Sequence, residues 1–288
     1  MTPAEISSRS PPSDAARAEA RAPQICCDAH FTESEGDDAR TSAWAAVKRN
    51  NVTIDPVEEA MSTSASDGPV IIFDVLGTLV DQAGSLHRHV REATGYDDAG
   101  VARIVAEWLG YVAERERAIV SGRSTFVPSD VLDAEALERM TAAGVLPARA
   151  LEPLADASLR LDPWPDTIDA LHQFAAEATV MGLSNASRRV LTGLSVHAGL
   201  RWHQFLSGED ATTYKPDPRI YRAAIAAVPD EDVPPYLVAA HAWDLRAAAE
   251  AGMRTAYVPR PNGDPPMPDD SFDVSAENLG DLHRKLFG

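Results

Sequence analysis

The sequence predicts an α/β protein with a doubly wound parallel sheet and an inserted helical cap. Short apolar runs alternate with helix-like segments along the second half of the chain, an order typical of parallel strands joined by right-handed crossovers. Between the first and second runs, apolar residues recur at helical spacing. We therefore expect a core domain of residues 67–85 and 162–288 and a cap domain of residues 86–161.

The first strand is expected at Val70–Phe73, an unbroken apolar run of the kind found in a strand buried on both faces. Asp74 then lies at the carboxyl end of this strand, and Gly77 permits a sharp bend after it. Ligands of open α/β sheets bind at that edge. Asp74 is either a turn or helix cap, which is common after strands, or a functional carboxylate.

The insertion is expected to hold three or four helices, interrupted at Pro128, Gly144 and Pro147. The aromatic residues in or beside it are expected to pack between helices or to form an apolar pocket wall: Trp108, Tyr111, Phe126 and Trp164. Its arginines are expected to be solvated or to pair with Glu114 and Glu116, although one could reach an anionic substrate: Arg115, Arg117 and Arg123.

Polar residues follow the later strands. The strand at 179–183 is followed by Ser184 and Asn185, which could cap a helix starting near Arg188 or face a ligand. After a short strand at 205–208 comes Lys215, whose ammonium would keep Asp74 ionised if it pointed inward.

The remaining elements complete the alternation. A strand at 236–240 leads to His241 and Asp244, a helix is expected from Leu245 to Ala251, and a strand at 254–258 follows. A last short strand and a helix are expected between Phe272 and Leu286.

Composition excludes some functions. The chain has 288 residues and a formal net charge of -18, which disfavours nucleic-acid binding because phosphates would be repelled. We see no apolar stretch long enough for a membrane helix and no signal peptide, so a cytoplasmic location without membrane partners is the default expectation. Residues 1–66 have a disorder-like composition, and we expect the folded part of the chain to begin near Met61.

Four short motifs, taken together, resemble those of the haloacid dehalogenase superfamily, and most closely the L-2-haloacid dehalogenases (type II). They are Asp74-x-x-Gly77-Thr78, Ser184-Asn185, Lys215-Pro216 and Trp243-Asp244. The resemblance covers about residues 70 to 260, and it implies a Rossmann-like core under a cap. It also suggests a homodimer that acts on a small-molecule substrate.

Two positions separate the reactions of this superfamily. By resemblance, its phosphatases commonly carry a general acid two residues after the nucleophile and a magnesium-binding acid four residues before the position of Asp244. This chain has Leu76 and Ala240 there. Without them there is no proton donor and too few oxygen ligands for a hard cation. We therefore expect no metal and no cofactor.

The resemblance implies a role for each motif residue. Asp74 would displace halide from C2 of a short 2-haloacid to give an ester, which water then cleaves to a 2-hydroxy acid. Lys215 would keep Asp74 ionised, and Asp244 would position Lys215 or the water. Thr78 and Ser184 would bind the carboxylate of the substrate, Asn185 would help to bind the halide, and Tyr221 would support the site. Leu76 and His241 are also expected to be substrate-site residues.

The chain also departs from the family pattern. The family usually has Tyr at position 76, an Arg just after the cap Trp where this chain has Leu109, and Ser and Asn at positions 239 and 241. His241 is either a packed or capping imidazole or a base that activates water. The alternatives to a dehalogenase are a magnesium-dependent phosphatase and a binding protein that has lost its chemistry.

Overall fold

The fold comes from a computed structural model, which describes residues 68–230 and 232–288. The expectations of disorder in residues 1–66 and of a fold beginning near Met61 lie outside these residues. No helix in the described ranges is both long and apolar enough to cross a membrane.

The core is a six-stranded sheet of order β3-β2-β1-β4-β5-β6 in which every pairing is parallel. The strands are β1 (Val70–Asp74), β2 (Thr179–Ser184), β3 (Gln204–Ser207), β4 (Tyr236–Ala239), β5 (Arg254–Tyr257) and β6 (Val274–Ser275). The first five strands match the expected ranges to within one residue at each end, and β6 lies in the segment where a last short strand is expected. Because β1 lies between β2 and β4, its carboxyl end is flanked by the ends of both neighbours.

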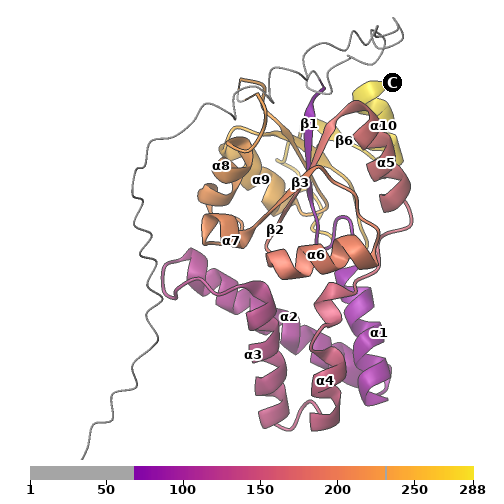
Figure 1. Cartoon of the computed structure of the whole chain (residues 1–288), viewed down its shortest axis with the longest axis vertical. Coiled ribbons are helices and arrows are strands. Elements are labelled where there is room, and N and C mark those ends of the chain that lie inside the picture. Colours follow the sequence, from indigo (N-terminus) through magenta and orange to yellow (C-terminus); the bar gives the residue numbers. More distant parts are fainter. Residues whose placement is uncertain (1–67, 231) are drawn as a thin grey trace, which may run out of the picture. The chain divides into compact units, whose positions relative to one another are not determined.

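Helices cover both faces of the sheet. Ile71 and Phe73 of β1 pack into one apolar core and Ile72 into the other, because successive strand residues point to opposite faces. The first core includes α5 (Thr167–Glu177), α6 (Arg188–His197) and α10 (Leu279–Phe287), and the second includes α8 (Pro218–Ile225) and α9 (Ala242–Glu250). Figure 1 shows α5 and α10 on one side of the strands and α8 and α9 on the other. The doubly wound architecture is thereby confirmed.

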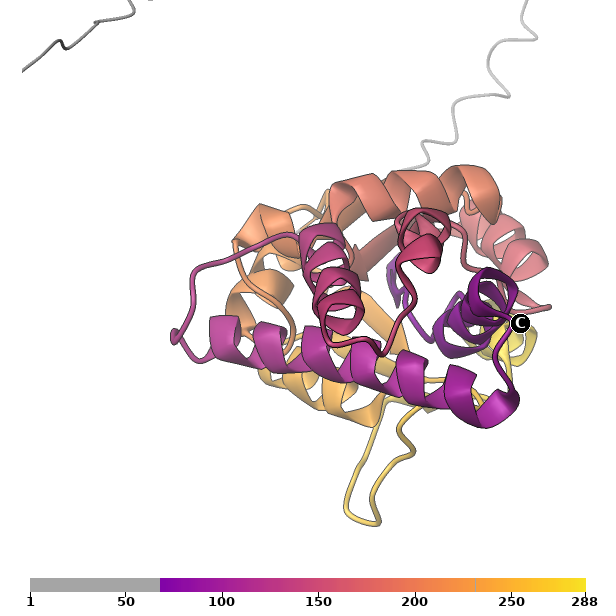
Figure 2. The same cartoon turned by 90° about the horizontal axis from the view of Figure 1, so that it is seen from below.

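Four helices and two short 3-10 turns form the insertion between β1 and α5. They are α1 (Gln82–Thr94), α2 (Asp98–Val120), α3 (Ser129–Ala142), α4 (Leu151–Leu154) and the turns Ala148–Ala150 and Ala157–Leu159. Figure 2, seen from the cap, shows the long α2 with α3 packed against it. The predicted helical cap is therefore present at the carboxyl edge of the sheet (Figure 1).

The two connections between core and cap lie side by side. Asp81 N donates to Asp162 O (2.8 Å), and Asp162 N donates to Ser85 Oγ (2.8 Å). On the core side, Trp164 N and Thr167 Oγ1 both donate to Leu79 O, at 3.0 and 2.7 Å. This double connection fixes the cap over the turn that follows β1.

The aromatic residues of the cap serve packing and anchoring. Trp108 is buried, and its Nε1 donates to Asp133 Oδ1 at 2.7 Å. Phe126 packs on Tyr214 of the core with ring centroids 5.2 Å apart. Trp164 Nε1 donates to Gly77 O at 3.1 Å. Packing between helices, one of the two interpretations left open by the sequence, is thus seen for Trp108, which joins α2 to α3. Phe126 and Trp164 instead make contacts with the core.

Three local predictions need correction. Helix α1 begins at Gln82 rather than near 86, because the Asp81 side chain caps it by accepting from Gly84 N at 2.9 Å. Helix α9 begins at Ala242 rather than Leu245, which places Asp244 in its first turn, where a carboxylate complements the helix dipole. Arg115 pairs with Glu135 of α3 instead of its sequence neighbours.

Candidate active site

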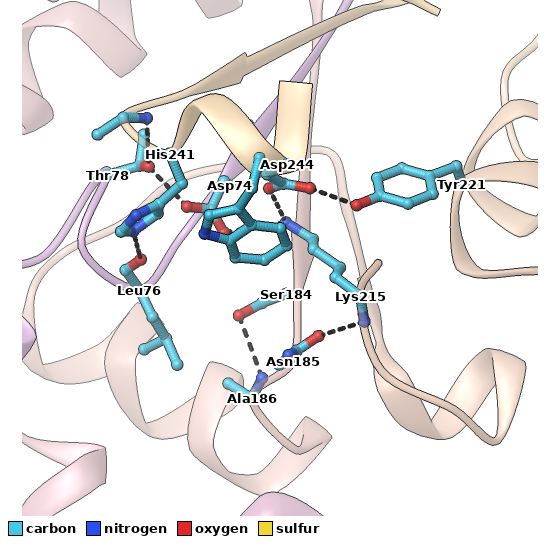
Figure 3. A network of polar contacts seen from close by, with 12 residues as sticks. Asp74, Leu76, Thr78, Ser184, Asn185, Ala186, Lys215, Tyr221, His241 and Asp244 are labelled. Atoms are coloured by element: carbon cyan, nitrogen blue, oxygen red, sulfur yellow. Dashed lines mark hydrogen bonds and ion pairs between the residues drawn. The ribbon is translucent and has the colours of Figure 1, made fainter. Parts of the chain in front are cut away.

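Asp74 is the last residue of β1, and its carboxylate is held by two donors. Lys215 Nζ donates to Oδ1 at 2.9 Å, and Thr78 Oγ1 donates to Oδ2 at 2.6 Å (Figure 3). Only 6% of the residue is exposed. These contacts leave lone pairs free on both oxygens while fixing their direction. Such a carboxylate is suited to attack a carbon atom rather than to cap a helix.

The turn after Asp74 is fixed by hydrogen bonds to its carbonyl groups. Trp164 binds the carbonyl of Gly77, and Arg260 Nε donates to that of Thr78 at 2.9 Å. Gly77 has φ +82°, and a Cβ there would lie 2.6 Å from His241 Nε2. A side chain at position 77 would therefore be strained and would displace the imidazole.

Lys215 lies between two carboxylates. Its Nζ donates to Asp244 Oδ2 at 2.6 Å as well as to Asp74, and all three side chains are buried. Burial alone would lower the pKa of Lys215, but the charges of Asp244 and Asp74 outweigh it and raise that pKa. The ammonium therefore stays charged and compensates for the negative charge of Asp74.

Tyr221 completes this charge network from the opposite side. Its hydroxyl donates to Asp244 Oδ1 at 2.6 Å. Burial and the charge of Asp244 raise the pKa of Tyr221 far above its usual value, so the phenol remains a donor. Both oxygens of Asp244 are thus occupied, one by Tyr221 and one by Lys215.

Asn185 joins the core to the cap. Its Oδ1 accepts from the backbone N of Lys215 at 2.8 Å, and its Nδ2 donates to Glu116 Oε2 at 3.0 Å. Ser184 Oγ accepts from Ala186 N at 3.1 Å. Neither Ser184 nor Asn185 caps α6, because Ser187 does so by accepting from Val190 N.

His241 bridges two acceptors. Its Nδ1 lies 2.8 Å from Asp264 Oδ2 and its Nε2 lies 3.3 Å from Leu76 O. Burial alone would lower the pKa of His241, but the charges of Asp74 and Asp264 outweigh it and raise that pKa. Since a carboxylate and a carbonyl both require a donor, the arrangement favours the doubly protonated imidazolium. The imidazole occupies the N-cap position of α9 without capping it, and a base role does not suit this geometry.

A pocket of about 260 Å³ opens at this carboxyl edge. It is lined by Asp74, Leu76, Gln82, Leu109, Ala113, Glu116, Ser184, Asn185, Lys215, His241 and Trp243. Six of the nine predicted site residues are among them. The other three, Thr78, Tyr221 and Asp244, are fully buried behind the pocket wall. The resemblance predicts that Thr78 and Tyr221 are substrate-site residues, but their hydroxyls are bonded to the carboxylates of Asp74 and Asp244 instead.

Residues of the cap were missed by reasoning from the sequence alone. Glu116 was interpreted as a surface partner of neighbouring arginines, whereas it faces the pocket. Leu109, Ala113 and Glu116 are spaced by four and three residues, so they share one face of α2. That spacing could have indicated that Glu116 lies on the same helix face as Leu109, but the charged run around Glu116 is also typical of a solvated face.

A metal centre would need several ligating side chains grouped around one point. In residues 68–230 and 232–288, no three His, Cys, Asp or Glu side chains are grouped to hold a metal ion. The prediction of a metal-independent reaction stays a prediction.

Comparisons with known proteins identify the class. The chain belongs to the haloacid dehalogenase-like hydrolase family, whose sequence pattern matches residues 69–252. An (S)-2-haloacid dehalogenase of Pseudomonas fluorescens is 34% identical over 115 residues, which cover 38% of this chain and 50% of that protein. The chain thus spans about half the length of the first curated relatives it matches.

Solved structures show the same likeness over a longer range. An L-2-haloacid dehalogenase designated PA0810 is 30% identical with a TM-score of 0.67, covering 76% of this chain and 98% of that one. The defluorinating L-2-haloacid dehalogenase Rha0230 is 28% identical with a TM-score of 0.68, covering 78% and 98%. The resemblance seen in the four motifs is thereby confirmed.

Proposed function

We propose that this protein is a hydrolytic dehalogenase that converts short 2-haloacids to 2-hydroxy acids through an ester of Asp74. The observation that carries the proposal is the Asp74 carboxylate, bonded to Lys215 and Thr78 at the pocket wall, with Leu76 two residues further on. The names of the relatives support the substrate class.

The first step is a substitution at carbon. An oxygen of Asp74 attacks C2 of the substrate, a C–O bond forms, and the halide leaves with the electron pair of the C–halogen bond. Halide needs no proton to leave, so the absence of an acidic side chain at position 76 does not hinder this step. Lys215 and Thr78 hold the carboxylate in one direction, which favours attack because the reacting atoms need not be reoriented.

The second step is ester hydrolysis. Water attacks the carbonyl carbon of the Asp74 ester, the 2-hydroxy acid leaves with an oxygen that belonged to Asp74, and one proton is released to solvent. Lys215 is within hydrogen-bond distance of Asp74 Oδ1, so its ammonium can stabilise the oxyanion that forms there. Asp244 and Tyr221 hold the ammonium in place.

A substrate panel with and without metal tests this function. Purified protein treated with EDTA is incubated with 2-chloropropionate, and chloride release is measured. We expect release at the same rate with and without added magnesium. Magnesium-dependent release of phosphate from sugar phosphates, with no chloride release, would favour the phosphatase alternative. No turnover of either substrate class would favour a binding protein.

A further inference from the structure

The pocket has an unusual balance of charge for an anionic substrate. None of the side chains that line it in the described residues is an arginine. The two cationic groups at the pocket are already paired, the ammonium of Lys215 with Asp74 and Asp244 and the imidazole of His241 with Asp264. Glu116 adds a further acidic group on the cap side of the pocket. A 2-haloacid must therefore enter a site where an ionised Glu116 would repel it.

The hydrogen bonds around Asn185 define how Glu116 is oriented. The Asn185 carbonyl oxygen accepts from Lys215 N, so its amide NH₂ must face Glu116. Glu116 Oε2 accepts that bond at 3.0 Å. Within the described residues, the one hydrogen bond to the Glu116 carboxyl group is made at Oε2, so a proton on Glu116 would be carried by Oε1.

We propose that the protonation state of Glu116 controls whether this pocket binds an anion. In its acid form, Oε1–H donates a hydrogen bond to the anionic end of the substrate. In its ionised form, the carboxylate repels that group. This inference rests on the proposed function, because it assumes that the substrate is an anion.

The surroundings of Glu116 support a change of state near neutral pH. Burial raises the pKa of Glu116 to about 7, against the opposing hydrogen bond from Asn185. Among the charged or titratable groups around it, Asp133 of α3 raises this pKa, whereas Arg117 of α2 and Lys215 lower it. Tyr214 also faces Glu116, whose charge helps to raise the pKa of that phenol. Asp74 and His241 line the same pocket. Both protonation states are therefore populated in the neutral range.

Binding of a stable anion tests the proposal without turnover. The dissociation constant of L-lactate, a 2-hydroxy acid, is measured by calorimetry at pH 6 and pH 8 for the unaltered protein and for Glu116→Gln. If only the acid form binds, the constant of the unaltered protein rises about tenfold between these pH values, in proportion to the lost acid fraction. Glutamine keeps one acceptor for Asn185 and presents an NH₂ in place of Oε1–H, so Glu116→Gln should retain tight binding at pH 8.

Comparing the two proteins at both pH values removes the contributions that other titrating groups make to the pH dependence of binding. Titration of His241 affects both proteins, so the ratio of their dissociation constants reports only the contribution of Glu116 to the pH dependence. Glu114→Gln, an exposed position on the same helix, serves as the matched control and should behave like the unaltered protein. The same ratio at pH 6 and pH 8, or no lactate binding at either pH, would overturn the proposal.

A separate assay distinguishes failure of this inference from failure of the proposed function. Chloride release from 2-chloropropionate at pH 6 reports the function alone. If chloride is released but the ratio of the two dissociation constants does not depend on pH, only the role of Glu116 is contradicted. Loss of release in the unaltered protein defeats the dehalogenase function and, with it, the inference.

Discussion

Asp74→Asn is expected to lower kcat for 2-haloacids by more than about 10⁴-fold, because the amide cannot attack carbon as a carboxylate does. The substitution preserves side-chain volume, and the amide oxygen of the variant can still accept from Lys215 Nζ. Halide release with saturating 2-chloropropionate measures the effect. Mass spectrometry of the variant must show that the amide has not hydrolysed back to aspartate.

The circular dichroism melting curve provides the control for folding. A melting temperature close to that of the unaltered protein would assign the loss to chemistry. A variant that retains more than a tenth of the original kcat would exclude Asp74 as the nucleophile. The same result would contradict every role assigned to residues that contact it.

Lys215→Met is expected to damage both stability and catalysis. The ammonium compensates for two carboxylates that lie 2.9 and 2.6 Å away, and all three side chains are almost fully buried. Removing one partner of a buried ion pair leaves uncompensated charge, so the free energy of unfolding should fall by about 3–5 kcal/mol. Turnover should fall by about 10²–10³-fold, as expected when an oxyanion-stabilising donor is lost.

Lys285→Met is the matched control, because Lys285 pairs with Asp281 at the surface and its side chain is 44% exposed. An exposed pair contributes little, so this variant should unfold within about 1 kcal/mol of the unaltered protein. Urea unfolding at pH 7 measures both variants. Equal stability of the two variants would show that the free energy of unfolding does not depend on charge compensation by Lys215.

The centre of the sheet could be predicted because β1, β2 and β4 are largely apolar runs buried on both faces. Parallel order then places Asp74 and Asn185, at the ends of two neighbouring strands, at one edge of the sheet. The expectation that Lys215 reaches Asp74 came from the resemblance to the haloacid dehalogenase superfamily. The local pattern around Asp74 left this residue as a turn, a cap or a nucleophile. The structure adds the two donors that orient its oxygens.

The contacts made across the pocket could not be predicted in the same way. Asp264 lies in a loop far along the chain from His241, and no periodicity links them. Glu116 lies in a run of alternating charges that is typical of a solvated helix face, and only the packing of α2 turns it inward. Local patterns predict elements, whereas these contacts depend on how a cap and a loop meet the sheet.

The covalent step is the central claim, and a single turnover in H₂¹⁸O tests it most directly. Protein in excess over 2-chloropropionate is quenched after one turnover, and the peptide containing Asp74 and the product are analysed by mass spectrometry. We predict one ¹⁸O in Asp74 and none in the 2-hydroxy acid, because water attacks the ester carbonyl while the product takes an oxygen of Asp74. Label in the product with none in Asp74 would contradict an ester intermediate on Asp74.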